Sequence, residues 1–193
     1  AGAHPGVSLQ QRVGNRNEII EQLRSFQIDV AIMGRPPSDM AVESSEIGPH
    51  PLVIVAAPDH RLAGRRGLWK IDLYDEVFLI REEGSGTRTS MAIYLAAAPK
   101  RSVDLQMEMG RNETIKQAVM AGLGVAFISG HTVAAEIESG RLAVLDVEGL
   151  PILRKWFVVR RADKALTPAV KAFADFLVAD GAGYLPRLSL PAR

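Results

Sequence analysis

The loop REEGSGTRTSM, residues 81–91, contains the residue types best suited to hold a small charged molecule. It follows the apolar run VFLI, and its two glycines, the second of them Gly86, permit close backbone approach and a positive φ. Ser85, Thr87 and Arg88 supply side-chain donors, and the helix expected to follow presents unpaired N–H groups with partial positive charge. The loop predicts an anion site, but a plain strand-to-helix turn with a hydroxyl cap explains it equally well.

A second helix start, formed by Asn112, Glu113 and Thr114, could serve the same site. Asn112 is expected to cap a helix that ends near Gly122, and Glu113 would complement the helix dipole. Capping alone would also explain these three residues. If this helix start and the glycine loop lie on one rim, they form a preorganised site for phosphate or carboxylate oxygens.

A third candidate is the segment MGRPPSDM, which leaves a predicted strand at Met33 and is stiffened by two prolines. The guanidinium of Arg35 could make a bidentate contact with an anionic ligand. A solvated loop arginine is the alternative interpretation.

The sequence carries no signature of catalysis or of metal binding. It has no Cys, its four His are scattered without an HExxH pair, and Ser85 does not lie in a GxSxG motif. The glycine loop also lacks the GxGxxG and GK[ST] nucleotide fingerprints. We therefore expect no enzyme activity, no catalytic residue, no metal and no cofactor.

Composition is that of an ordinary globular protein of 193 residues, with 47% hydrophobic residues and 23 Lys plus Arg against 22 Asp plus Glu. The net charge of +1 argues against an overall attraction to nucleic acid. No apolar stretch approaches the roughly 18 residues that a membrane span needs. Without a visible signal peptide, the expected location is the cytoplasm.

Short apolar runs alternate with capped helical segments, which is typical of an α/β protein. One helix is expected to be capped by Asn17 and the last by Thr167, with Pro168 in its first turn and Gly181 at its end. The predicted strands cover residues 7–13, 28–33, 52–57, 77–80, 103–109, 125–129, 142–147 and 155–161.

An internal echo suggests that the chain has two related halves. NEIIEQLRSFQIDVA, residues 17–31, aligns without gaps on NETIKQAVMAGLGVA, residues 112–126, at an offset of 95, with six identities. Coincidence is one interpretation, because capped helices share composition. The other is two lobes of similar design, each presenting a helix start at the same topological place.

The segments IDVAIMGRPP, PLVIVAAPDHRLAG, GSGTR, NETIKQAVMAGLGVAFIS and GRLAVLDVEGLPILRKWFVVRR follow one another over most of residues 7–162. Together they resemble the C-terminal effector-binding domain of LysR-type transcriptional regulators. Within that family, MEMGRNETIKQAVMAGLGVAFISGHTVAAE with MGRPP looks most like the regulators of Calvin-cycle carbon-fixation operons.

The resemblance implies a periplasmic binding protein type 2-like fold, with two Rossmann-like lobes joined by two crossover strands near residues 52–57 and 151–157. Lobe I would comprise residues 1–55 plus 155–193, and lobe II residues 56–154. The family pattern begins with a strand and a helix before HPGVSL, so we expect both to be missing here, together with the DNA-binding helix-turn-helix.

The resemblance also implies a function. The co-inducer would lie between the lobes, held by the segments matching Ser85–Gly86–Thr87–Arg88, Asn112–Glu113–Thr114 and Met33–Arg35. Its class would be a small anion such as a sugar phosphate, phosphoenolpyruvate, a nucleotide or NADPH. The regulator would be a homodimer or tetramer, would bind DNA only through the absent helix-turn-helix, and would not contact a membrane. A periplasmic-type solute-binding protein for a small anion is the alternative.

Overall fold

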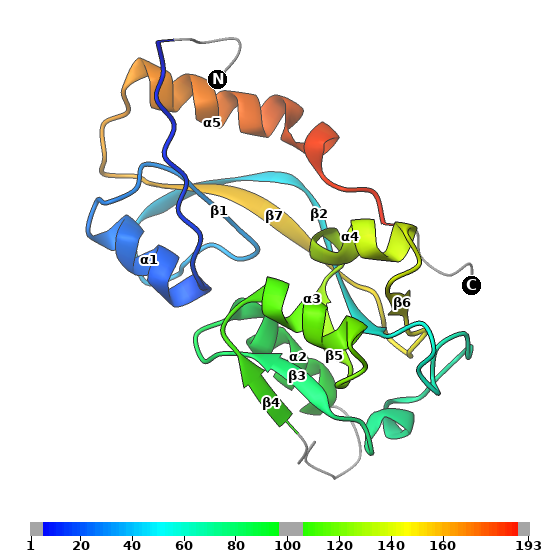
Figure 1. Ribbon diagram of the computed structural model, residues 1–193. Helices are drawn as coiled ribbons and strands as arrows, with labels where there is room; N and C mark the ends of the chain where they lie inside the picture. Colours follow the sequence, from blue (N-terminus) through cyan, green and yellow to red (C-terminus); the bar gives the residue numbers. More distant parts are fainter. Residues whose placement is uncertain (1–5, 97–105, 189–193) are drawn as a thin grey trace. The chain divides into compact units, whose positions relative to one another are not determined.

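The computed structural model describes residues 6–96 and 106–188, in which helices and strands alternate (Figure 1). The helices are α1 (Arg16–Arg24), α2 (Gly86–Ala96), α3 (Asn112–Met120), α4 (Gly130–Glu138) and α5 (Pro168–Asp180), with 3-10 turns η1 (Lys70–Leu73) and η2 (Gly181–Tyr184). The strands are β1 (Ala31–Met33), β2 (Val42–Ala56), β3 (Phe78–Arg81), β4 (Gln106–Met109), β5 (Ala126–Ser129), β6 (Ala143–Val144) and β7 (Ile152–Arg161).

The chain divides into two compact units. The first contains the residues up to Gly48 and Lys155–Tyr184, and the second contains Pro49–Arg154 and the residues from Leu185. Strands β2 and β7 each pass from one unit to the other, and the chain passes between the units a third time after Tyr184. The effector-binding lobes 1–55 plus 155–193 and 56–154 stay a prediction.

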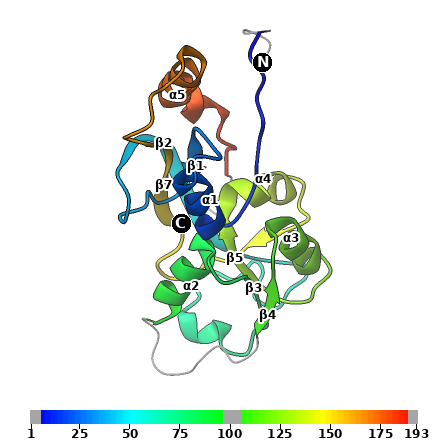
Figure 2. The same ribbon diagram turned by 90° about the vertical axis from the view of Figure 1, so that its left-hand side faces the viewer.

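In the first unit, β1 pairs antiparallel with β7, and β7 lies next to β2. The apolar face of α1 packs Ile20 and Leu23 against Met33 and Val159, and α5 lies on the other side of these strands (Figures 1 and 2). Helix α5 begins as predicted: Thr167 Oγ1 accepts from Val170 N at 3.4 Å, Pro168 occupies the first turn, and the C-cap is Gly181.

The second unit is built on a sheet covered on both faces. Strand β3 pairs in parallel with β4, Val125 bridges β3 to the start of β5, and β5 pairs antiparallel with β2. Side chains alternate between the faces. Leu52 and Phe127 pack with the Met91 and Tyr94 side chains of α2, and the opposite face packs against α3 and α4 (Figure 2).

Two local predictions are wrong. Residues 7–13 form no strand, and Val7, Leu9 and Val13 are exposed, because alternation produces a strand only where a neighbouring strand completes the hydrogen-bond ladder. Helix α1 is capped by Asn15 rather than Asn17, which lies inside the first turn. Of the predicted strand 103–109, residues 103–105 lie outside the described residues and the rest is β4.

No helix in residues 6–96 and 106–188 is long and apolar enough to cross a membrane.

Candidate functional site

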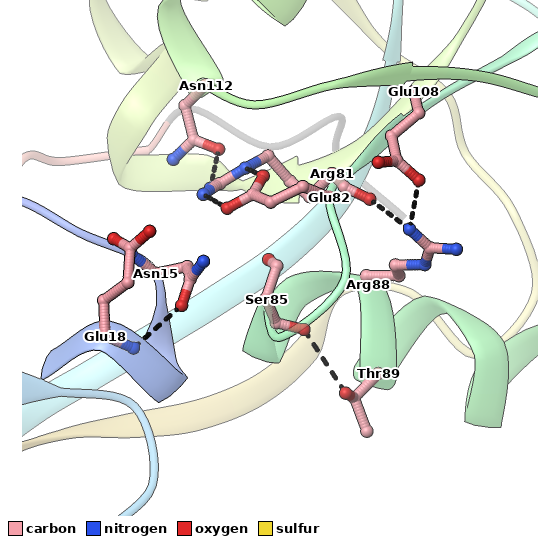
Figure 3. Close-up of polar contacts among 9 residues, drawn as sticks. All are labelled: Asn15, Glu18, Arg81, Glu82, Ser85, Arg88, Thr89, Glu108 and Asn112. Atoms are coloured by element: carbon pink, nitrogen blue, oxygen red, sulfur yellow. Dashed lines mark hydrogen bonds and ion pairs between the residues drawn. The ribbon is translucent and has the colours of Figure 1, made fainter. Parts of the chain in front are cut away.

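The glycine loop joins β3 to α2 within the second unit (Figure 3). Gly84 has a φ of 84°, which turns the chain, and Gly86 is the first residue of the helix. Buried Ser85 donates its N–H to Glu82 O at 3.3 Å, and its carbonyl accepts from Thr89 N at 3.2 Å. The amides between these two bonds, from Gly86 to Arg88, are therefore the first-turn donors of α2. Thr87 lies in this turn and is half-buried.

Arg88 is anchored beside the loop and remains one-third exposed. Its Nη1 donates to Arg81 O at 3.2 Å and to Glu108 on β4 at 2.5 Å. Both contacts use one nitrogen of the guanidinium. Among the described residues, these contacts leave Nε–H and Nη2–H as the pair of donors that a bidentate contact with an oxyanion needs.

Arg81, which the sequence analysis did not single out, connects the two predicted helix starts. It is 13% exposed; Nε and Nη2 donate to Glu82 at 2.7 and 2.8 Å, and Nη1 donates to Asn112 Oδ1 at 2.6 Å (Figure 3). One signal in the sequence could have indicated Arg81: it is a charged residue at the end of a buried apolar strand, directly before a glycine loop. Because Arg81 also accepts from Arg88, one network holds the starts of α2 and α3 together.

The start of α3 differs from its prediction. The N-cap is Arg111, which makes no side-chain cap, and Asn112 is the first helical residue with its side chain engaged by Arg81. Glu113 is exposed and bonded by Lys116 at 2.9 Å; hydrogen bonds from Lys116 first, and then Gln117, lower the pKa of Glu113. Thr114 is exposed.

Met33 and Arg35 belong to the first unit. Met33 is buried in the core formed with α1, whereas Arg35 is exposed in the loop after β1. The network that joins Arg88 to Asn112 contains neither residue. Among the described residues, no group of three or more His, Asp or Glu side chains could hold a metal ion.

The family comparison matches almost the whole chain. The model of the LysR substrate binding domain aligns with residues 1–182. The HTH-type transcriptional regulator CbbR of Sinorhizobium medicae is 50% identical over 187 residues, which are 97% of this chain and 60% of that protein. The RuBisCO operon transcriptional regulator of Allochromatium vinosum is 42% identical over 179 residues, 93% of this chain and 59% of that protein. The chain thus spans about three fifths of the length of these curated relatives.

Solved structures agree with this comparison. The CcmR regulatory domain of Synechocystis PCC6803, in complex with 2-PG, is 31% identical with a TM-score of 0.84, covering 96% of this chain and 88% of that one. The effector binding domain of QuiR in complex with shikimate, 20% identical with a TM-score of 0.77 over 95% of this chain and 86% of that one, supports the fold alone. The predicted periplasmic binding protein type 2-like α/β fold is confirmed. The chain belongs to the LysR substrate-binding domain family.

Proposed function

We propose that this chain is the effector-sensing domain of a LysR-type transcriptional regulator that controls carbon-fixation genes in response to a phosphorylated metabolite. Relatives named CbbR and a RuBisCO operon regulator, at 50% and 42% identity, support this assignment. The whole protein is a cytoplasmic homodimer or tetramer without enzyme activity. It binds DNA through a helix-turn-helix outside this chain.

The observation that carries the proposal is the likeness to the CcmR regulatory domain, whose structure contains 2-PG. That ligand is 2-phosphoglycolate, an anion with a phosphate and a carboxylate group. The site in the second unit offers chemistry of the matching kind, since helix amides and a guanidinium fork bind oxyanions.

The proposed roles follow from the geometry of each residue. The first-turn amides of α2, at Gly86 and Thr87, donate to oxygens of the anion, and Ser85 fixes the turn that presents them. Arg88 supplies the fork. Asn112, Glu113 and Thr114 shape the adjoining helix start, and Met33 and Arg35 are further proposed effector contacts.

Effector binding is proposed to change how the oligomer presents its DNA-binding domains. Coupling of this kind is typically worth about 1–3 kcal/mol, which changes an affinity several-fold to about a hundredfold. An effector that binds both states equally would shift nothing, so the anion must favour one of them.

Calorimetric titration of the 193-residue chain tests the proposal. The ligands are 2-phosphoglycolate, phosphoenolpyruvate, a sugar phosphate and NADPH. Saturable binding of at least one, with a single site per chain, is expected. If none binds under conditions where the chain is folded, the proposal is wrong.

The matched variants are Arg88→Ala and Arg65→Ala. Arg88→Ala should weaken binding at least about tenfold, because a charge-assisted contact is lost. Arg65 is an exposed arginine whose guanidinium lies 3.6 Å from Asp72, so its loss should leave the affinity unchanged. Equal affinities in both variants would remove Arg88 from the site.

A further inference from the structure

The guanidinium of Arg81 decides which end of the Asn112 side chain is available to a ligand. Arg81 Nη1 donates to Asn112 Oδ1 at 2.6 Å (Figure 3). A guanidinium has donors only, so the reversed amide would set its NH2 group against another donor. The Asn112 amide is therefore held with its oxygen toward Arg81 and its nitrogen away from it.

The nitrogen of that amide has no acceptor within the described part of the chain. Asn112 is half-buried in the first turn of α3, and its one side-chain hydrogen bond to a described residue is the bond from Arg81. A half-buried amide costs free energy while its N–H groups lack acceptors. The two N–H donors of Asn112 are thus ready to bond an acceptor atom of a ligand.

Glu82 holds Arg81 in this position. The Glu82 carboxylate accepts from Arg81 Nε at 2.7 Å and from Nη2 at 2.8 Å, a two-bond contact that fixes the plane of the guanidinium. The same contact balances the charge of Arg81, whose side chain is 13% exposed. All three guanidinium nitrogens are engaged by Glu82 or Asn112, so Arg81 is placed to orient a neighbour.

We propose that Arg81 is a positioning residue that makes Asn112 a hydrogen-bond donor to the bound effector. This inference rests on the proposed function and specifies the polarity of the proposed site. The Asn112 donors add to the guanidinium fork of Arg88, so the site favours oxygen atoms that carry no proton, as in phosphate and carboxylate groups. A group that can only donate, such as an ammonium, finds no acceptor in Asn112 because Arg81 occupies it.

The variant Asn112→Asp separates this role from a merely structural one. It keeps an oxygen for Arg81 but replaces the NH2 group by a second oxygen. An acidic residue in the first turn of a helix is favourable, so thermal unfolding of the 193-residue chain should occur at the same or a higher temperature. Calorimetry should nevertheless show the affinity for 2-phosphoglycolate falling at least about a hundredfold, against about tenfold for Asn112→Ala.

Arg111→Gln is the matched control for charge. It lowers the net charge by the same amount at the exposed neighbouring residue, and should weaken binding by no more than about threefold because exposed charges are screened. An affinity of Asn112→Asp equal to or above that of Asn112→Ala would overturn the inference, since the oxygen of Asn112 would then be the atom that matters.

A second set of variants tests Arg81 itself. Arg81→Met combined with Glu82→Gln removes both charges of the pair and frees the Asn112 amide to rotate. Adding Asn112→Ala to this background should weaken 2-phosphoglycolate binding by less than about threefold, whereas the same change in the unmodified chain costs about tenfold. A tenfold cost in both backgrounds would overturn the role of Arg81.

NMR provides a signature that a structural role would not give. The side-chain NH2 resonances of Asn112 should shift saturably with 2-phosphoglycolate, at the concentrations that saturate the calorimetric signal. Saturable binding with unmoved Asn112 NH2 resonances would overturn this inference and leave the proposed function standing. An unmodified, folded chain that binds none of the proposed anions would contradict both.

Discussion

Helices α1 and α3 begin the two stretches that align at an offset of 95, yet their first turns are held in different ways (Figure 3). Helix α1 has a capping box formed by its own residues: Asn15 Oδ1 accepts from Glu18 N at 3.0 Å, and Glu18 Oε2 accepts from Asn15 N at 3.0 Å. Helix α3 has no side-chain cap, and Asn112 is bonded by Arg81 instead. The difference lies just outside the aligned residues: Asn15, which caps α1, precedes residues 17–31, and the corresponding position before α3 is Gly110. The start of α1 is therefore sealed by its own cap, whereas the start of α3 is open.

The turns that follow the two helices differ as well. At the offset of 95, Gly124 of the second unit corresponds to Asp29 of the first. A Cβ on Gly124 would lie 2.3 Å from Val77 O, whereas the exposed Asp29 carboxylate pairs with Lys164 at 2.7 Å. The second unit thus brings its backbone segments closer together at this point.

The largest expected effect is that of Gly124→Ala. It should lower the free energy of unfolding by about 3 kcal/mol, because the new methyl group meets a backbone carbonyl that cannot move alone. Asp29→Ala, at the corresponding position, should change it by less than about 0.5 kcal/mol. Urea denaturation measures both, and similar losses would show that the two turns are equivalent.

Acid should weaken the second unit, which contains all three histidines of the described residues. The folded chain keeps His50 neutral down to about pH 4, whereas an unfolded histidine takes a proton near 6.5. The contribution of neutral His50 to the free energy of unfolding is therefore fully present above about pH 6.5. At pH 5 the free energy of unfolding is about 2 kcal/mol lower. His50→Gln should flatten this dependence in denaturation at pH 5 and pH 7; an unchanged slope would contradict it.

The next largest effect is expected for Lys116→Met, which should lower the free energy of unfolding by about 1.5 kcal/mol. Lys116 lies 2.9 Å from both Glu113 and Glu136, and the Glu136 carboxylate is 9% exposed, so its charge would lose its nearest partner. The corresponding residue in α1 is exposed Glu21, whose pair with Arg24 lies at the surface. Glu21→Gln should cost about 0.3 kcal/mol; a larger loss than that of Lys116→Met would reverse the comparison.

The smallest stability effect concerns the two asparagines. Asn15→Ala removes the cap of α1 and should cost about 1 kcal/mol without changing effector affinity. Asn112→Ala should cost less, because Arg81 keeps its two bonds to Glu82, but it should weaken the effector. Thermal unfolding and calorimetry together separate these outcomes, and an effector response to Asn15→Ala would contradict them.

Local signals explain which parts of this molecule could be predicted. Thr167, Pro168 and Gly181 define α5 through contacts a few residues apart, and the alternation of helices and strands follows from hydrophobic patterning. Residues 7–13 have a strand pattern but no strand, since pairing depends on a partner remote in sequence. The role of Arg81 could not be predicted for the same reason, because its contact with Asn112 joins residues 31 positions apart.

The choice of cap shows a similar limit. Asn15 and Asn17 have equal intrinsic capping ability, and the reciprocal bond with Glu18 selects Asn15. Asn112 has that ability too, but Arg81 occupies its side-chain oxygen. Helix existence was therefore predictable, whereas the bonding of each helix start was not.

The most direct test follows the backbone amides of the 193-residue chain by NMR while 2-phosphoglycolate is added. The open helix starts predict saturable shifts at Gly86, Thr87, Arg88 and Asn112, with the amides of the sealed first turn at Arg16–Glu18 unmoved. Saturable shifts at the start of α1 with none at α2 and α3, or no shifts at all, would contradict the account.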